Sequence, residues 1–515
     1  MADLAIHVPA QKVPESTRTI KKGTDAMSAS LEPVITPVNP TGAKKKAVDW
    51  EQVRRWDEAY VFHVCSTAEE YRCNPVESTD GCYVTLADGT RIFDFANQLV
   101  CVNMGHRHPR IQQAIREATE KFGYVWEGMT TEYRSRAAKL IMEDLGVGRW
   151  AGRIRFLATG TEAVENMVQF AKLYTGRRHI VTRSYDYHGW TNGLTGANGV
   201  RGYRSSLASG DGEPAIRDIP DSPSPNYHYA PSPQCYRCPI GHTYPNCKDK
   251  SGTLACVRAT EHLIRTIGVE SVAGFLTEPA QGAGMIHPPA EYFPQIREMT
   301  ARLGVLWLDD EVMTGFGRLG EWFGYDVYHV TPDIMAVAKG LVSSALPASA
   351  VILSKELSAF FDKWRFETMS TFGSHPLAMA AVCANIEAML EENILGQVRE
   401  LGAHLGDGLR ELQRKHRSLG LVSGRGLMWA LELVRNQETR EPFIKVDRYS
   451  TYARTGETPA SQVVGRICWE EGVAVGAFLP NSIRIATAFV ATKADIDLGL
   501  RALHKGLAEL DKHCE

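Results

Sequence analysis

The feature that most constrains the fold of this chain is a series of short apolar runs separated by longer amphipathic stretches. Four such runs, each too short for a typical helix, lie at 154–157, 179–182, 272–276 and 305–308. Apolar runs of this length are typical of strands buried on both faces, and the helical patterns between several of them indicate βαβ units. We therefore expect an α/β protein with a largely parallel sheet flanked by helices.

The remaining parts of the chain have different patterns. Residues 1–47 are polar, contain several prolines and show no apolar period, which predicts a flexible arm. Two apolar runs joined by an Asp-Gly turn predict a β-hairpin over 83–95. Residues 207–256 are rich in proline and cysteine and predict an irregular insert. Helical patterns return after Pro376 and lead into a mixed C-terminal segment.

Composition excludes several classes of protein. The formal net charge of −3 is too small to indicate nucleic acid or a membrane surface as the main partner. The chain has no apolar stretch long enough to span a bilayer and no signal-peptide pattern in its arm. Eleven scattered cysteines do not indicate a disulfide framework. We therefore expect a cytoplasmic protein that acts on small molecules.

A candidate phosphate-binding turn follows the first apolar run. Thr159 and Glu162 have the spacing of a helix-capping box, and the helix is expected to end near Gly176. Gly160 and Thr161 stand at the helix entrance, where free N–H groups and the helix dipole favour an anion. The alternative is a well-capped helix that binds nothing.

Three acids follow the run at 305–308. Asp309, Asp310 and Glu311 are expected at the carboxyl end of a parallel strand, where α/β proteins bind ligands, although capping of the next helix is an alternative. The segment 315–320 matches the dinucleotide pattern G-x-G-x-x-G and leaves a nicotinamide-dependent oxidoreductase as a distant alternative. The adjacent acids would repel a pyrophosphate, and Met335 stands where a ribose-binding acid is expected.

Lys339 ends the next apolar run, where a solvated lysine is unusual. Loss of water lowers the pKa of a lysine, and imine formation requires the neutral amine. The alternative is a lysine that extends from a strand end into solvent.

In combination these segments resemble the class III (ω-) aminotransferases of the fold-type I pyridoxal-phosphate family, over about residues 60–500 and in the same order. The shared motifs are Gly105-His106-Arg107-His108-Pro109, Gly160-Thr161-Glu162-Ala163, Tyr187-His188-Gly189, Glu278-Pro279-Ala280-Gln281-Gly282, Asp310-Glu311-Val312, Ala338-Lys339-Gly340 and the segment 370–376.

The resemblance implies both a fold and a set of roles. The fold is a large cofactor-binding domain, 111–375, with a smaller α+β domain from both chain ends, 48–110 and 376–515. Lys339 would form the Schiff base with pyridoxal 5′-phosphate, and Asp310 would pair with its pyridine nitrogen. The implied cofactor-binding residues are Gly160, Thr161, Tyr187, His188, Glu278, Asp310, Val312, Lys339 and Thr371. Because Thr371 would reach the phosphate of the neighbouring subunit, the resemblance also implies a homodimer, and pairing of dimers into tetramers stays open.

The implied reaction is ping-pong transfer of an amino group from a primary amine or ω-amino acid to a 2-oxo acid such as pyruvate or 2-oxoglutarate. A racemase, aminomutase or decarboxylase of the same cofactor family would use the same Lys339 and Asp310. Arg484 matches the family's carboxylate-binding arginine, but Ala283 replaces the glutamate that pairs with it in some branches. Cys65 replaces an aromatic pocket residue, which would leave room for a larger donor.

The insert contains Cys235, Cys238, Cys247 and Cys256. A Cys-x-x-Cys pair with two further cysteines is compatible with structural zinc, but the last two lack paired spacing. We therefore predict thiols and no metal.

Overall fold

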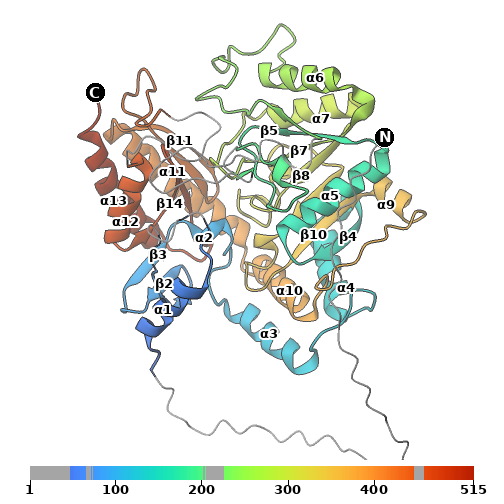
Figure 1. Cartoon of the computed structure of the whole chain (residues 1–515), viewed down its shortest axis with the longest axis horizontal. Helices are drawn as coiled ribbons and strands as arrows, with labels where there is room; N and C mark the ends of the chain where they lie inside the picture. The colour runs from blue at the N-terminus through green and yellow to red at the C-terminus, as the bar shows by residue number, and fades with distance from the viewer. Residues whose placement is uncertain are drawn as a thin grey trace, which may run out of the picture. The chain divides into compact units, whose positions relative to one another are not determined.

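The computed structural model of the chain describes residues 47–64, 66, 71, 73–200, 203–204, 226–445 and 458–515. Residues Trp50–Glu515 form one compact unit (Figure 1). Except for Ala47, the predicted flexible arm lies outside the described residues, and so does Cys65.

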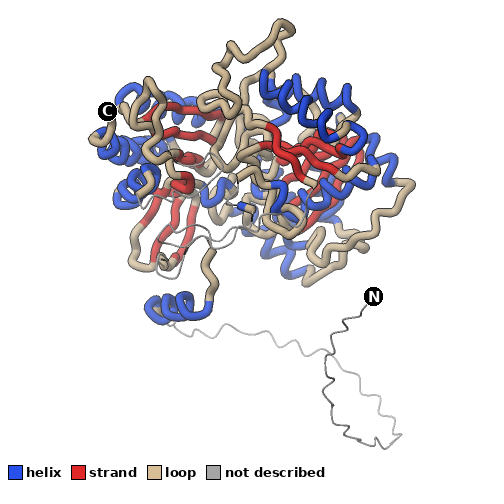
Figure 2. Tube along the Cα trace, turned by 45° about the horizontal axis from the view of Figure 1, so that its top comes forward, coloured by secondary structure: helices blue, strands red, loops and turns tan. Residues whose placement is uncertain are grey.

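The largest sheet of the described residues has seven strands; Figure 2 shows it with helices around it, apart from the smaller sheets. Its strands, in spatial order, are β4 (Ala151–Leu157), β10 (Ser349–Ser354), β9 (Ile334–Val337), β8 (Leu306–Asp310), β7 (Val272–Thr277), β5 (His179–Arg183) and β6 (Tyr227–Ala230). β10 is antiparallel to both neighbours, whereas the pairings from β9 to β6 are parallel. The predicted α/β class with a mostly parallel sheet is confirmed.

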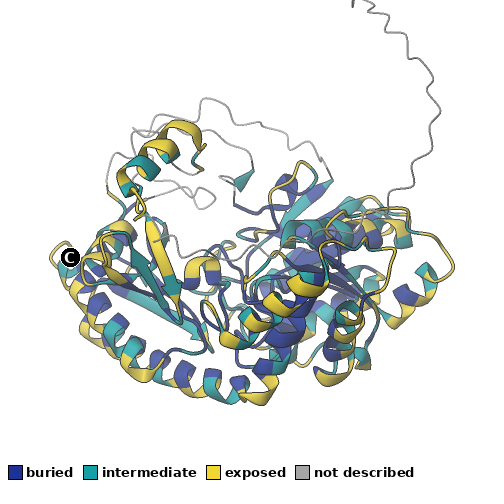
Figure 3. Ribbon diagram, turned by 90° about the horizontal axis from the view of Figure 1, so that it is seen from below, coloured by how far each residue is buried: buried dark blue, intermediate teal, exposed yellow. Residues whose placement is uncertain are grey.

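Alternate residues of the central strands face opposite layers of helices, because successive side chains of a strand point to opposite faces. Leu276 and Leu308 belong to the buried cluster with Met167 of α5 (Gly160–Thr175). Phe275 and Trp307 belong to the cluster on the other face, which includes residues of α7 (Tyr292–Leu303). Buried residues accordingly concentrate in the sheet and on the inner sides of its helices (Figure 3).

Two four-stranded sheets complete the β-structure. The first, in spatial order, contains β1 (Val76–Asp80), β2 (Tyr83–Leu86), β3 (Arg91–Asp94) and β13 (Val473–Ala474). The second contains β11 (Leu419–Arg425), β12 (Met428–Leu433), β15 (Ser482–Ala486) and β14 (Gly476–Leu479). The predicted hairpin is confirmed as β2 and β3, and its Gly89 has a φ of +87°. β13 pairs in parallel with β3 and thereby joins segments from both ends of the chain.

The other helices are α1 (Trp50–Tyr60), α2 (Asn97–Val100), α3 (Pro109–Lys121), α4 (Glu132–Lys139), α6 (Ala255–Ile267), α8 (Gly324–Val327), α9 (Lys355–Phe361), α10 (Pro376–Glu391), α11 (Ile394–Lys415), α12 (Ala460–Glu470) and α13 (Lys493–Asp511). Short helical turns occur at Leu140–Asp144, Val147–Arg149, Thr195–Ala197, Val269–Ser271 and Lys339–Leu341. No helix of the described part is both long enough and apolar enough to cross a membrane.

The segment predicted as an irregular insert contains regular structure at its end. Tyr227–Ala230 forms the edge strand β6, and α6 begins at Ala255. Short strands are missed in sequence when many nearby prolines obscure their apolar pattern. Residues 207–225 of this segment lie outside the described residues.

Candidate active site

The candidate site lies where parallel strands of the central sheet end. Asp310 is the last residue of β8, and Lys339 follows the neighbouring strand β9. Asp310 is paired with Ala336 of β9, so the two functional residues project from the same edge of the sheet. Lys339 has a φ of +33°, a conformation that is strained for a non-glycine residue and is common at functional sites.

The charge state of Lys339 depends on its burial. Loss of water lowers the pKa of the amine, against the opposing influence of Cys101, Asp310 and Glu278. A lysine with a lowered pKa has more of the neutral amine that imine formation requires, so Lys339 stays the predicted imine-forming residue.

The side chain of His188 contacts the Asp310 carboxylate and fixes its orientation. Nδ1 of His188 lies 2.7 Å from Oδ2 of Asp310, and both side chains are buried. The backbone N–H of Val312 donates to the other carboxylate oxygen at 3.1 Å. These contacts orient the carboxylate at the strand end, where it can accept a hydrogen bond from a protonated ring nitrogen.

The predicted phosphate-binding turn is the start of α5. The Thr159 hydroxyl accepts from the N–H of Glu162, whose carboxylate accepts from Ala158 rather than closing the predicted capping box on Thr159. The N–H groups of Gly160 and Thr161 precede the first intrahelical bonds and remain available to an anion.

Close packing explains why glycine is required at this turn. A Cβ at Gly160 would lie 3.0 Å from a methyl group of Val312, and a Cβ at Gly189 would lie 2.4 Å from the Thr161 hydroxyl. The helix start, the Tyr187-His188-Gly189 loop and the segment after β8 therefore enclose one site. The structure brings together six predicted residues here: Gly160, Thr161, His188, Asp310, Val312 and Tyr187.

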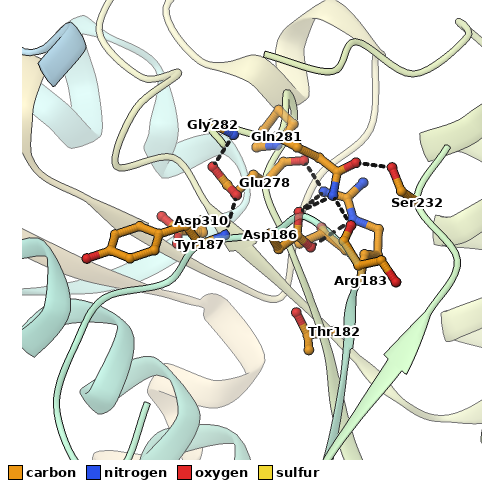
Figure 4. A network of polar contacts seen from close by, with 12 residues as sticks. Thr182, Arg183, Asp186, Tyr187, Ser232, Glu278, Gln281, Gly282 and Asp310 are labelled. Carbon is orange, nitrogen blue, oxygen red and sulfur yellow. Dashed lines mark hydrogen bonds and ion pairs between the residues drawn. The ribbon is translucent and has the colours of Figure 1, made fainter. Parts of the chain in front are cut away.

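Glu278 fixes the backbone beside the site, whereas Tyr187 presents its ring. Glu278 accepts hydrogen bonds from the backbone N–H groups of Tyr187 and Gly282, each at 2.8 Å (Figure 4). Burial, with the nearby charge of Asp186, raises the pKa of Glu278 to about 8. The ring of Tyr187 points away from this polar network and meets the ring of Tyr203 edge to face, with centroids 5.2 Å apart; the residue as a whole is 39% exposed.

Two buried charged residues of the site were not identified from the sequence. Arg183 and Asp186 form an ion pair with 2.8 and 2.9 Å hydrogen bonds, and Gln281 donates to Asp186 at 2.7 Å (Figure 4). The available signal was an arginine followed three residues later by an aspartate, directly before the Tyr-His-Gly motif. Such spacing is common on surfaces, so it does not by itself indicate burial.

Arg484 of β15 approaches the same loop from the second small sheet. Its Nη1 donates to the carbonyl of Gly282 at 3.2 Å, and burial lowers the pKa of its guanidinium. The buried side chain of Ala283 brings no charge to this loop. Arg484 therefore lies beside the Glu278–Gly282 segment, and its contact with substrate stays a prediction.

Thr371 lies outside this group within one chain. It is exposed, and its carbonyl accepts from the hydroxyl of Tyr124 at 2.8 Å. Its neighbours Met369 and Phe372 also expose large apolar side chains. Cys65 lies outside the described residues, so its predicted place in the donor pocket stays a prediction.

The glycines of 315–320 do not form a nucleotide-binding turn. They are followed by irregular turns and the four-residue helix α8, rather than by a long helix whose start could bind a pyrophosphate. Added Cβ atoms at Gly317 and Gly320 would meet Phe489 and Arg399, which shows tight packing.

The cysteines of the insert are free thiols, as are the other described cysteines. Within the described ranges, no group of three or more His, Cys, Asp and Glu side chains is placed to hold a metal ion. Burial raises the pKa of Cys235 to about 11 and that of Cys256 to about 12.

The residues of the site fit pyridoxal phosphate, the cofactor that the resemblance implies. Lys339 is an amine suited to imine formation, and Asp310 is a fixed carboxylate suited to a ring nitrogen. The start of α5 offers N–H groups to a phosphate, in a turn that a Cβ at Gly160 would crowd. The exposed ring of Tyr187 offers a stacking surface.

Comparisons with known proteins agree with this arrangement. The sequence profile of the family "Aminotransferase class-III" matches residues 66–507. An S-selective transaminase from Bacillus megaterium is 44% identical, with a TM-score of 0.85 over 90% of this chain and 99% of that chain. A taurine:2-oxoglutarate aminotransferase from Bifidobacterium kashiwanohense, solved with PLP and glutamate, is 27% identical, with a TM-score of 0.81 over 91% of this chain and 100% of that chain. A leucine/methionine racemase from Thermococcus litoralis is 30% identical over 81% of this chain and 87% of its own length.

Proposed function

The chain belongs to the class-III aminotransferases, which are pyridoxal-phosphate-dependent enzymes, and from this premise we propose that it moves the amino group of a primary amine or ω-amino acid to a 2-oxo acid. The observation that carries this proposal is the meeting of Lys339 and Asp310 at one edge of the sheet, beside the start of α5.

Each residue of the site has a defined task in this reaction. When bound, the cofactor supplies an electron sink for the electron pair left on the substrate carbon after its proton is removed. Asp310 keeps the ring nitrogen protonated. The Nζ amine of Lys339 would hold the cofactor and, as a neutral amine, would serve as the base that takes the proton from the substrate carbon. The ring of Tyr187 and the side chain of Val312 would contact the cofactor ring.

Arg484 is proposed to bind the carboxylate of the 2-oxo acid. The guanidinium of Arg484 lies beside the Glu278–Gly282 loop, and an arginine can bind a carboxylate through two parallel N–H···O bonds. Ala283 stands where other branches of the family have a glutamate. The name of the Bacillus megaterium relative favours an S-configured primary amine as donor, and that of the Bifidobacterium enzyme favours 2-oxoglutarate as one acceptor.

We also propose a homodimer with active sites at the subunit interface. Helix α1 buries none of its residues, and the apolar side chains at and after its end are strongly exposed, with Phe62 at 91% and Tyr60 at 82%. Exposed apolar surface of this extent is typical of an interface between subunits. In such a dimer Thr371 would reach the phosphate site of the partner subunit.

The free thiols support a reducing compartment, and we propose the cytoplasm. Detection of the protein in the cytosolic fraction of the source cells, with its thiols reactive to an alkylating reagent, would support this location. Recovery of the protein in an oxidising compartment would contradict it.

The experiment that tests the function is a visible absorption spectrum of the protein reconstituted with pyridoxal phosphate. A panel of amines, including taurine, β-alanine, 4-aminobutyrate, putrescine and 1-phenylethylamine, is added without an acceptor. We expect one donor to bleach the visible band of the lysine-bound cofactor, and pyruvate or 2-oxoglutarate to restore it. The control is Lys339→Ala, which should bind the cofactor without forming that band.

Two outcomes would contradict the proposal. If the reconstituted wild-type protein has no band, the role of Lys339 is wrong. If an amino acid changes configuration with no acceptor present while the band persists, the enzyme is a racemase, as the similarity to the Thermococcus litoralis protein allows.

A further inference from the structure

A buried row of alternating charges extends from Asp310 to the far side of the site. His188 contacts Asp310 through Nδ1 at 2.7 Å, and its Nε2 lies 3.7 Å from Asp186. Asp186 in turn pairs with Arg183. The side chains of Arg183, Asp186 and His188 are fully buried, and that of Asp310 is nearly so.

The charges of this row sum to zero only if His188 is charged. Two carboxylates and one guanidinium leave a net negative charge in a region without water, and an imidazolium between the carboxylates cancels it. Burial by itself lowers the pKa of His188, but the carboxylates of Asp310, 2.7 Å from Nδ1, and of Asp186, 3.7 Å from Nε2, outweigh this effect and raise the pKa to about 10. Glu278 and the hydroxyl of Thr182, which is 3.1 Å from Nε2, also face the imidazole.

Asp186 itself is fixed by groups from two further segments. Gln281 donates from its side-chain amide to Asp186 and to the carbonyl of Ser184, each at 2.7 Å. Arg183 donates to the carbonyl of Glu278 at 2.6 Å. Ser232 donates to the side-chain oxygen of Gln281, which fixes the amide that holds Asp186 (Figure 4).

We propose that Asp186 is a positioning residue for the ring nitrogen of the cofactor: it keeps His188 a charged donor, which holds the Asp310 carboxylate directed at that nitrogen. This inference rests on the proposed function, because it requires Asp310 to meet the cofactor ring. With Asp186 neutral, the buried imidazole loses its second anionic partner and releases its proton. The Asp310 carboxylate then loses a facing positive charge and binds the protonated nitrogen less strongly.

The test compares two ligands that differ only at the ring nitrogen. Pyridoxal phosphate and its 1-deaza analogue, which has carbon in place of that nitrogen, are titrated into cofactor-free wild type and Asp186→Asn, and both dissociation constants are measured. We expect Asp186→Asn to raise the dissociation constant of pyridoxal phosphate roughly tenfold, the equivalent of one pKa unit. The dissociation constant of the analogue should stay unchanged. A variant that keeps the wild-type preference for pyridoxal phosphate would overturn the inference.

A matched control separates positioning from damage to the fold. Asp333 forms an ion pair with Arg297 at 2.7 and 2.9 Å and lies directly before β9, at the opposite end of that strand from Lys339. Asp333→Asn removes a comparable pair and should leave the preference between the two ligands intact. If Asp186→Asn lowers the affinity for both ligands equally, the role of Asp186 is merely structural and the inference is overturned.

His188→Gln gives a second test that does not depend on the folding of Asp186→Asn. Glutamine keeps a hydrogen-bond donor and removes the charge, so the same loss of preference is expected, and an unchanged preference overturns the inference. If wild type binds both ligands equally, the assignment of Asp310 in the proposed function fails as well. A wild-type preference that survives in both variants contradicts only the inference about Asp186.

Discussion

At the residue scale, burial lowers the pKa of two neighbouring bases, Lys339 and His188, but for His188 the facing carboxylates reverse the outcome. The pKa of Lys339 is lowered because loss of water is its dominant influence. The pKa of His188 is raised because two carboxylates outweigh the same loss of water. In one small region, therefore, the neutral form of an amine and the charged form of an imidazole are both favoured.

The raised pKa of His188 predicts how stability varies with pH. The folded-state pKa of about 10 exceeds the unfolded value of 6.5, so the contribution of the charged imidazole is complete below pH 6.5 and disappears as the pH rises through 10. The difference in free energy of unfolding between wild type and His188→Gln should therefore shrink over this range. Urea denaturation of the cofactor-free protein at several pH values measures it. The control is the exposed His262→Gln, and a difference that stays constant with pH would contradict the assignment.

Arg484→Ala tests the proposed acceptor contact. Hydrogen bonds to a charged partner contribute about 1.5–3 kcal/mol, so the KM for the 2-oxo acid should rise roughly ten- to a hundredfold. The KM for an amine donor without a carboxylate should change little. Steady-state kinetics with both substrates measures this, with Arg466→Ala on the exposed side of α12 as control. An unchanged acceptor KM would reject the role of Arg484.

At the element scale, the start of α5 is fixed by packing against segments from distant parts of the sheet. Gly160 contacts the segment after β8 through Val312 and the segment after β9 through Ala338. The turn therefore requires a residue without a side chain, and its glycine is explained by crowding rather than by backbone conformation. The same crowding holds the free N–H groups of the turn beside Asp310 and Lys339.

Gly160→Ala should reduce both stability and cofactor affinity. The new Cβ would lie 3.0 and 3.2 Å from the Val312 methyl groups, and crowding of this kind costs about 1–3 kcal/mol. Thermal unfolding and titration with pyridoxal phosphate measure the two effects. Gly123→Ala is a matched control, because a Cβ there meets no atom within 4 Å. Wild-type affinity in Gly160→Ala would show that the phosphate binds elsewhere.

At the scale of the whole molecule, the exposed apolar surface and the exposed position of Thr371 are the observations on which the proposed dimer rests. Thr371 is exposed and does not belong to the group around Lys339 in its own chain. The division into a large domain at 111–375 and a small domain from both chain ends stays a prediction, although β13 joins β3 across the chain.

Co-expression of two inactive variants tests the shared site. Lys339→Ala lacks the reactive amine, and Thr371→Glu places a carboxylate against the partner's phosphate. In a mixed dimer one site keeps both native residues, so an equal mixture should recover roughly a quarter of wild-type activity, because half of the dimers are mixed and each has one native site. Activity assays on the co-expressed pair measure this. No recovery, with mixed dimers demonstrated by two affinity tags, would contradict the interfacial site.

Local patterns in the sequence predicted the strands β4, β5, β7 and β8 of the seven-stranded sheet, the hairpin at β2 and β3, and the family to which the chain belongs. Short apolar runs, an Asp-Gly turn and the residues around Lys339 are local patterns, and local patterns reflect the periodicity and turn chemistry of the backbone. The family motifs also identified Asp310 and His188 individually. Nothing local indicated that Arg183 and Asp186 are buried.

Only the tertiary structure decided how these residues act together. His188 and Asp310 are 122 positions apart in sequence, and they meet because β5 and β8 end at the same edge of the sheet on either side of β7. The placement of antiparallel β10 between β4 and β9, and the edge strand β6 within a proline-rich segment, likewise depend on long-range pairing. Contacts of this kind follow from strand order and register, which the local pattern of a single sequence does not specify.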